Sequence, residues 1–217
     1  MNIRSIRLIQ SIAIAACLLL LTTAPGAQEP AESWDGLKLV PGTKVAAAYV
    51  HPDADFRQYG KFVITEPYIA FKKDWKREHR DVSASEMERI KERLGHLFVE
   101  VFTEALEEGG FPVVTSTGED VLVLRPALID LDVTAPDIMT AGRSRTYVTS
   151  AGAVTLYIEL LDGATGAMLA RAIDRKAGRN TTSFQISSSV YNAAEARTVL
   201  KFWAGLLRDR FKEIHGR

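Results

Sequence analysis

The densest group of side chains able to do chemistry is His51-Pro-Asp-Ala-Asp55. An imidazole and two carboxylates this close together are donors that a metal ion uses, but a complete site also needs a ligand from a distant segment. No second ligand cluster occurs along the chain. The pattern therefore favours a strand end followed by an Asp-rich turn, in which short carboxylates accept backbone hydrogen bonds. We expect no metal and no cofactor.

Motifs of known enzyme classes are missing as well. His96 and Glu100 are four residues apart on a predicted helix, whereas a zinc-protease helix carries a second histidine in HExxH. No G-x-S-x-G nucleophile motif occurs, and Gly109-Gly110 is typical of a helix end rather than of a phosphate-binding loop. We therefore expect a protein that is not an enzyme, and a hydrolase of an unrecognised kind has no positive support.

Two long polar segments are better functional candidates. Residues 134–152 carry Arg143 and Arg145, and residues 176–191 carry Arg179 and Asn180. Long loops beside rigid strands commonly hold binding residues. If the two segments meet, their guanidinium groups could hold an anion such as a phosphate or a sugar acid.

The second polar segment also contains apolar side chains, Phe184 and Ile186, which are unusual in a purely solvated loop. They favour an edge that pairs with a partner protein or with a second copy of the chain. A charge substitution at either residue is then expected to abolish association.

The elements that must position these segments follow from hydrophobic periodicity. Ser83 opens a helix with a capping box, because Glu86 stands three residues later. Apolar residues then recur at three- and four-residue intervals up to Gly109-Gly110, which predicts one buried face. They are Met87, Ile90, Leu94, Leu97, Phe98, Val101, Phe102 and Ala105. A second helix is expected from Asn192 as N-cap, with Glu195 three residues later.

Strands are expected at residues 45–50, 61–71, 111–115, 121–133, 154–160 and 168–174. Pro67 and Pro126 predict a bend, a bulge or a sheet edge. The densely charged residues 72–81 are interpreted as a solvated loop. Alternation over 154–160 and the Asp162-Gly163 turn predict an antiparallel hairpin with 168–174.

The predicted order is therefore β-β-α-β-β-β-β-α, joined by hairpins rather than by βαβ crossovers. This order predicts an α+β fold, a largely antiparallel sheet with two amphipathic helices packed on one face.

The first 27 residues have the pattern of an export signal. Arg4 and Arg7 precede an apolar run from Leu8 to Leu21, and small residues lead into a polar start at Gln28. The run is too short for a membrane-spanning helix, which needs about 20 apolar residues. We expect residues 1–27 to be a signal peptide, 28–42 a flexible tether and 43–217 one α+β domain.

Cys17 leaves two forms of export open. Ile14-Ala-Ala-Cys17 is typical of the small-residue box before a lipid-modified cysteine, and cleavage there would hold the chain on a membrane. Leu18 to Leu21 continue the apolar run beyond the cysteine, which favours a soluble exported protein instead. We expect contact with a membrane only if Cys17 is lipidated.

Charge excludes one class of partner. The chain has 27 basic and 27 acidic residues, and the signal holds two of the basic ones and no acid, so the remainder carries a formal charge of minus two. A nucleic-acid binder usually shows a strong basic excess. We expect no nucleic-acid partner.

Five segments stand out as a set: HPDADFRQY at 51–59, RPALIDL at 125–131, IELLDGATG at 158–166, ARAIDR at 170–175 and KFWAGLLR at 201–208. In this order they resemble an uncharacterised bacterial family of exported proteins and lipoproteins, the domain-of-unknown-function family 3313. The resemblance implies a bacterial envelope location, in the periplasm or lipid-anchored at the outer membrane. The family has no established activity, so the resemblance implies no catalytic residue.

These observations predict a non-enzymatic cell-envelope protein, periplasmic or membrane-anchored, that acts as a protein-binding or assembly module. Its partner would be another envelope protein or a second copy of the chain. The alternative is a soluble periplasmic protein that binds a small ligand or anion through the loops of Arg143 and Arg179.

Overall fold

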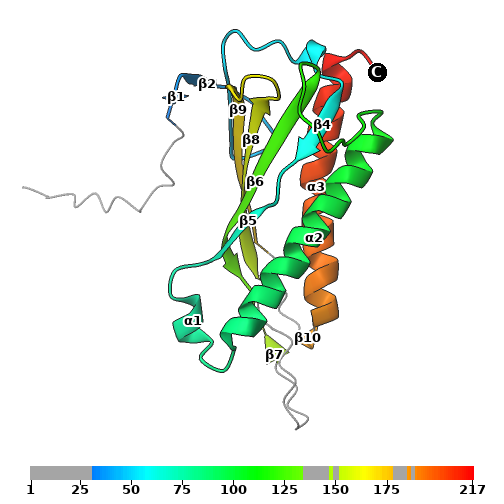
Figure 1. Ribbon diagram of the computed structural model, residues 1–217. Helices are drawn as coiled ribbons and strands as arrows, with labels where there is room; N and C mark the ends of the chain where they lie inside the picture. The colour runs from blue at the N-terminus through cyan, green and yellow to red at the C-terminus, as the bar shows by residue number, and fades with distance from the viewer. Residues whose placement is uncertain (1–30, 134–146, 149–151, 178–184, 187–188) are drawn as a thin grey trace, which may run out of the picture.

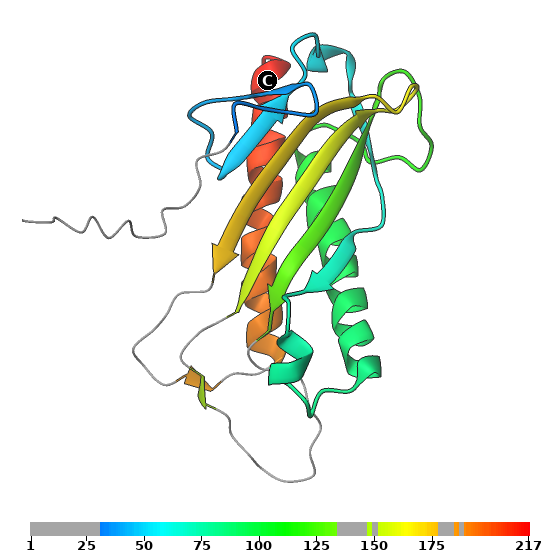
Figure 2. The ribbon, with the colours of Figure 1, turned by 90° about the vertical axis from the view of Figure 1, so that its left-hand side faces the viewer.

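A layer of strands covered on one face by two long helices makes up the protein (Figures 1 and 2). The computed structural model describes residues 31–133, 147–148, 152–177, 185–186 and 189–217. The helices are α2 (Ala84–Glu108) and α3 (Ser189–Ile214), which lie side by side. The predicted α+β fold, with two amphipathic helices on one face of the sheet, is confirmed.

The main sheet has eight strands in the order β1-β2-β3-β9-β8-β6-β4, with β5 also paired to β6. Their bounds are β1 Ser33–Trp34, β2 Leu37–Leu39, β3 Ala47–Val50, β4 Lys61–Ile64, β5 Tyr68–Phe71, β6 Val121–Asp132, β8 Ala153–Asp162 and β9 Met168–Ala177. The predicted antiparallel hairpin is β8 and β9, in which Glu159 pairs with Arg171. Two further strands, β7 (Tyr147–Val148) and β10 (Gln185–Ile186), form a separate sheet.

Strands β4 and β5 run parallel to β6, so the prediction of hairpins without a crossover is wrong here. The 25-residue helix α2 lies between β5 and β6 in the chain. Two parallel strands need such a long connection, because the chain must return to the same end of the sheet before the second strand can begin.

Two prolines lie where the parallel ladder is interrupted. The interruption agrees with the bend or edge predicted at Pro67, whereas Pro126, where a bulge or an edge was predicted, lies inside a strand that is paired on both sides. Pro67 lies between β4 and β5, and Pro126 lies on β6 between the pairs Ile64–Leu124 and Tyr68–Ala127. Pro126 therefore lies opposite the gap between β4 and β5, so its missing N–H removes no hydrogen bond from the parallel ladder. On the other side of β6, Pro126 still pairs with Ile158 of β8.

The helix α2 begins where the sequence predicted. Ser83 is its N-cap, and the Ser83 hydroxyl accepts a hydrogen bond from the backbone N–H of Glu86 at 3.1 Å. The carboxylate of Glu86 pairs with Arg89 and Arg93. Gly110 follows the helix in a left-handed conformation, with φ of 81°.

Three other sequence expectations need correction. Residues 111–115 form no strand, since only Val113 bridges to Phe62 and Pro112 has no N–H for a ladder. Helix α3 begins at Ser189, so Asn192 lies inside it and is not its N-cap. Residues 72–81, expected as a solvated loop, contain the short helix α1 (Trp75–Glu78).

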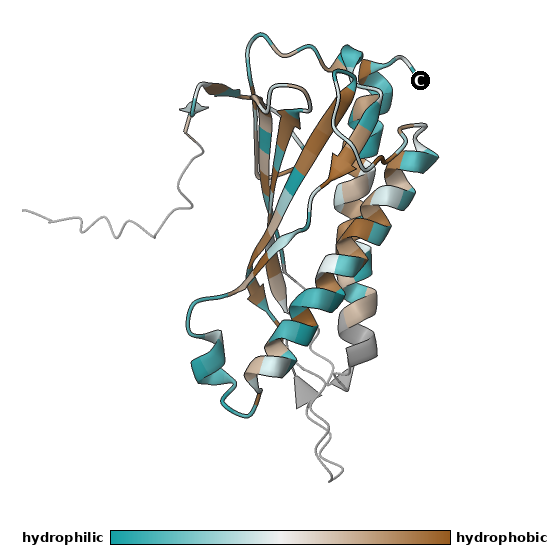
Figure 3. Ribbon diagram, in the orientation of Figure 1, coloured by the Kyte–Doolittle hydropathy of each residue, from teal (hydrophilic) through white to brown (hydrophobic). Residues whose placement is uncertain are grey.

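A single buried side chain holds helix α1 in place. The residues around it are mostly charged, and for this reason the sequence pattern predicted a solvated loop. Trp75 is fully buried between the rings of Phe71 and His79, and its indole N–H donates to the carbonyl of Val133. The rest of α1 is hydrophilic (Figure 3). One large apolar side chain is enough to bind this turn to the sheet end.

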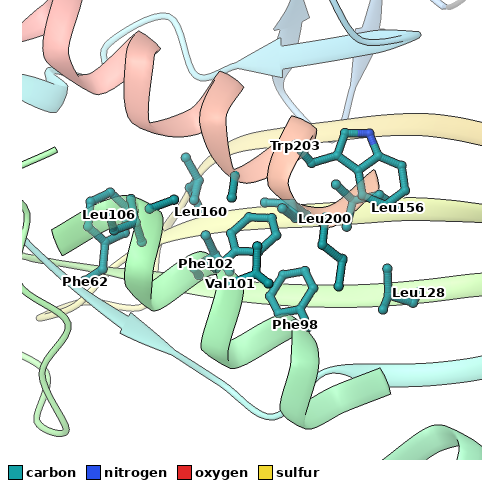
Figure 4. Packing of buried hydrophobic residues seen from close by; sticks show 14 of the residues in the cluster. Phe62, Phe98, Val101, Phe102, Leu106, Leu128, Leu156, Leu160, Leu200 and Trp203 are labelled. Carbon is teal, nitrogen blue, oxygen red and sulfur yellow. The ribbon is translucent and has the colours of Figure 1, made fainter. Parts of the chain in front are cut away.

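The core lies between the sheet and the two helices (Figure 4). The predicted face of α2 supplies Phe98, Val101 and Phe102, and α3 supplies Leu200 and Trp203. These side chains meet Leu122, Leu124, Leu128, Leu156, Ile158 and Leu160 of the sheet. An ordinary apolar core of this kind explains a fold whose described residues contain no cysteine.

Candidate functional site

Strands β7 and β10 join the two polar segments singled out by the sequence. Tyr147 pairs with Ile186 and Val148 with Gln185, in an antiparallel ladder. The pairing lies beyond the end of the sheet where β8 begins and β9 finishes (Figures 1 and 2). Of the predicted site residues, only Ile186 is in this pairing; Arg143, Arg145, Arg179, Asn180 and Phe184 lie outside the described residues, as does Cys17.

The opposite end of the sheet carries the N-terminal hairpin, which consists of β1, the turn Asp35-Gly36 and β2. Both turn residues have positive φ, 51° and 82°, as a two-residue hairpin turn requires. Leu37 of β2 is fully buried. The expectation that residues 28–42 form a flexible tether is therefore wrong for residues 33–39, because this hairpin packs on β3.

A buried ion network lies on the outer face, the face of the sheet that the helices do not cover. Glu159 of β8 accepts hydrogen bonds from Arg171 of β9 at 2.8 and 3.2 Å and from Arg125 of β6 at 2.7 Å. The Tyr157 hydroxyl donates to the same carboxylate at 2.9 Å. Only 8% of the Glu159 and Arg171 side chains is exposed, so both charges depend on each other for solvation.

Two residues of the N-terminal hairpin complete this network. Asp35 accepts a hydrogen bond from Arg171 at 2.9 Å, and the Arg171 guanidinium lies 4.2 Å from the centre of the Trp34 ring. Trp34 also packs edge-on against Tyr49 and Tyr157. A cation held between aromatic rings and two carboxylates is a strong, specific contact.

The electrostatics of the network act in opposite directions on Glu159 and on Tyr157. Burial opposes ionisation of Glu159, yet hydrogen bonds from Arg171 and Arg125 hold the pKa of its carboxyl below the ordinary value. Burial, with the neighbouring Glu159 carboxylate, raises the pKa of Tyr157 to about 12. Glu159 therefore stays ionised and Tyr157 stays protonated near neutral pH, so the hydrogen bond between them is retained there.

A second polar contact fixes the turn between β8 and β9. Tyr59 donates to Asp162 at 2.5 Å, and the other Asp162 oxygen accepts from the backbone N–H groups of Ala164 and Thr165. These hydrogen bonds, led by that of Tyr59, lower the pKa of Asp162 to about 2. The depressed pKa stabilises the fold above about pH 4, and this contribution is lost as the pH falls towards 2.

The contribution of Asp162 can be isolated by substitution. We expect Asp162→Asn to lower the free energy of unfolding by about 1 kcal/mol at pH 6, because solvent partly screens this half-buried group. The deficit is expected to shrink as the pH falls from 4 to 2, which urea unfolding of both proteins across this range measures. A deficit that does not change with pH would contradict this account.

The other sequence candidates have local partners. The Nδ1 atom of His51 accepts from the backbone N–H of Asp53, and Asp55 binds Arg57 at the start of the 3-10 helix Phe56–Gln58. Glu100 of the His96–Glu100 pair forms an ion pair with Arg197 of α3. Among the described residues, no three or more His, Cys, Asp or Glu side chains converge as metal ligands would.

The outer-face network is the feature that sequence reasoning missed. The alternation of β8 correctly placed Glu159 on the polar side of the strand, but the N-terminal hairpin buries that side. Counting residues back from the β8–β9 turn would not have shown that Glu159 faces Arg171, because the register of these two strands shifts between Leu160 and Leu161.

Comparison with known proteins gives a family and distant structural neighbours. The model of the family described as "Protein of unknown function (DUF3313)" matches residues 28–207. No curated protein matches the sequence. The PelC dodecamer from Paraburkholderia phytofirmans is similar at 15% identity and a TM-score of 0.37, over 69% of this chain and 89% of that one.

Two further solved structures are similar to the same degree. A DUF330 protein from Xanthomonas campestris has 14% identity and a TM-score of 0.35, over 74% of this chain and 92% of that one. A DUF4136 protein from Bacteroides thetaiotaomicron has 13% identity and a TM-score of 0.33, over 80% and 98%. Within the described residues, no helix has the length and apolar content needed to cross a membrane.

Proposed function

Because the chain belongs to the DUF3313 family, whose description states no function, we propose from its own residues that it is a non-enzymatic module of the bacterial cell envelope. It binds another envelope component or takes part in an assembly. The export pattern of residues 1–27 supports the location. The lipid-modified form, anchored through Cys17, and the soluble periplasmic form both agree with this role.

The observation that carries the proposal is the pairing of β7 with β10. It joins two polar segments at one end of the sheet, while the N-terminal hairpin lies at the other end (Figure 1). A chain attached through its N-terminus would therefore present the β7–β10 end away from the attachment point. Short strands at the tip of a rigid sheet are well suited to pairing with a partner.

Charge substitutions in the second segment test this role. We expect the Phe184→Asp and Ile186→Asp variants to lose at least about tenfold in recovery of the partner, because a buried charge opposes strand pairing and apolar contact. Cross-linked pull-down from envelope extracts, quantified against the unsubstituted chain, measures the recovery.

Tyr68→Asp provides the matched control, because Tyr68 is an apolar side chain on β5 with 66% of its surface exposed. Its recovery of the partner is expected to be unchanged. Equal recovery by the Ile186 and Tyr68 variants would count against the β7–β10 end as the binding surface.

Anion binding is the second candidate function, and the same pairing supports it. The joined segments carry Arg143 and Arg145 on one side and Arg179 on the other. Inorganic phosphate or a sugar acid would then raise the melting temperature, since a ligand stabilises the state that it binds. The rise is expected to vanish in an Arg143→Ala, Arg179→Ala variant. A melting temperature that neither anion changes would exclude this function.

A further inference from the structure

The N-terminal hairpin covers only part of the outer face of the sheet. Figure 2 looks onto this face: the hairpin crosses its upper end, and below the hairpin no other described element lies over the middle of β6, β8 and β9. Paired residues share a face of a sheet, and side chains alternate along each strand. The register around Arg125, Glu159 and Arg171 therefore identifies the residues that face outward in this uncovered part.

An apolar row lies next to the buried ion network. It consists of Ala127 of β6, Tyr157 of β8 and Ile173 of β9, which are paired in register. All three are half-buried, and neither Ile173 nor Ile129, the next outward residue of β6, belongs to a hydrophobic cluster of the described residues. Tyr68 of β5 pairs with Ala127 at the margin of the row and has 66% of its surface exposed. Apolar side chains gathered on an uncovered face are typical of an interaction surface.

Strand β6 carries opposite charges on the two sides of this row. On the side of the ion network, the network flank, Arg125 binds Glu159 and still has 54% of its side chain exposed. On the other side, the far flank, Asp130 follows Ile129 with φ of 52° and is exposed. Its carboxylate accepts a hydrogen bond from the hydroxyl of Thr155 at 3.3 Å, which places it on the outer face.

A second pair of charges flanks the row at β9, in the opposite order. Asp35 of the hairpin binds Arg171 on the network flank and has 66% of its side chain exposed. Arg175 pairs with Thr155 on the far flank and is exposed. Each flank therefore carries one positive and one negative charge, and the order at β6 is the reverse of that at β9.

We propose that this face binds the same face of a second copy of the chain, with a two-fold axis along the apolar row. Such an axis aligns the strands of the two sheets and lays the network flank of each copy on the far flank of the other. Arg125 then faces Asp130 of the partner copy, and Asp35 faces Arg175 of the partner copy. By symmetry each contact occurs twice, and the two apolar rows meet between them.

The charge pattern selects a second copy as the occupant of this face. A surface matches itself only when the charges related by its two-fold axis are opposite, and both pairs that flank the row meet this condition. The hairpin is compatible with the arrangement, because it covers the network flank and would lie over the uncovered far flank of the other copy. One apolar row with four ion pairs makes a small interface, so we expect a dimer of micromolar or weaker affinity.

Charge reversal with complementation tests the geometry. Arg125→Glu alone and Asp130→Lys alone each place like charges opposite one another in a homodimer, so each is expected to weaken association by about tenfold or more. A mixture of the two variants has opposite charges at both contacts and is expected to form a heterodimer about as readily as the unsubstituted chain forms its homodimer. Sedimentation equilibrium measures the association, and thermal melting checks that each variant is folded. A chain that is monomeric at every concentration, or a mixture that associates no better than the single variants, would overturn the proposal.

Cross-linking gives a readout that leaves every charge in place, since Arg125→Glu also puts a second carboxylate beside Glu159. Ala127 lies on the proposed axis and faces the same residue of the partner copy. In a Cys17→Ser background, which removes the only other cysteine, Ala127→Cys is expected to give several times more dimer with a short bismaleimide than Glu92→Cys, an exposed position on α2. Equal yields from the two positions would also overturn the proposal.

This interface goes beyond the proposed function, because it uses a surface other than the β7–β10 end. Two variants keep the two hypotheses apart. Tyr68→Asp is expected to weaken the dimer, because it places a charge at the margin of the apolar row, and to leave partner recovery unchanged. Ile186→Asp is expected to reduce partner recovery and to leave the dimer unchanged. A dimer that Tyr68→Asp does not weaken counts against this interface alone, and a recovery that Ile186→Asp does not reduce counts against the proposed function alone.

Discussion

Replacing Arg171 with alanine is expected to lower the free energy of unfolding by about 3–5 kcal/mol, the usual cost of breaking a buried ion pair. Glu159 would stay buried with only the outer Arg125 and the Tyr157 hydroxyl as partners. Trp34 would lose the cation on which it packs. For a chain of this size the melting temperature is expected to fall by about 6–20 °C, which calorimetry measures.

Two comparisons make the Arg171 result specific. Arg125→Ala is expected to cost only about 1 kcal/mol, because 54% of the Arg125 side chain is exposed. The double variant Arg171→Met, Glu159→Leu is expected to regain most of the loss, since no unpaired charge remains buried. If Arg125→Ala and Arg171→Ala cost the same, the outer-face network does not work as described.

Gly163→Ala is expected to cost about 2–4 kcal/mol through a backbone clash. A Cβ on Gly163 would lie 2.4 Å from the carbonyl oxygen of Val121 and 2.8 Å from that of Gly118. Neither oxygen can move freely, because Val121 begins β6 and its carbonyl accepts the Gly163 N–H at 2.9 Å. Denaturant unfolding measures the loss.

Gly166→Ala is the matched control in the same turn. Gly166 has φ of 73° but no atom within 4 Å of an added Cβ, so only the left-handed backbone opposes alanine. The expected cost is about 1 kcal/mol. A larger loss at Gly166 than at Gly163 would show that turn conformation, rather than close approach of β6, dominates at this corner.

Much of the fold could be predicted because its signals are local. The spacing in α2 and the alternation in β8 each report on one element, and the turn from Asp162 to Gly166 reports on its neighbours. The crossover through α2 was missed because parallel or antiparallel pairing of β5 with β6 depends on residues that are far apart. The need for glycine at position 163 likewise comes from β6, which no local pattern reveals.

The candidate site was harder to predict for the same reason. Arg171 and Asp35 are 136 residues apart, so their contact leaves no trace in either segment. One local signal was present: Asp35-Gly36 between Trp34 and Leu37 is a strong two-residue hairpin pattern. The apolar residues of the second polar segment favoured pairing with a partner protein or a second copy, whereas the structure pairs Ile186 in β10 with β7 of the same chain.

The measurement that tests the central claim most directly is mass spectrometry of the chain's N-terminus after cell fractionation. The account predicts that the protein is found in the envelope fraction and that its signal has been removed. Its first residue is then near Gln28 with a free amine, or is a lipid-modified Cys17. A chain that still begins at Met1 and is found in the cytosol would contradict the account.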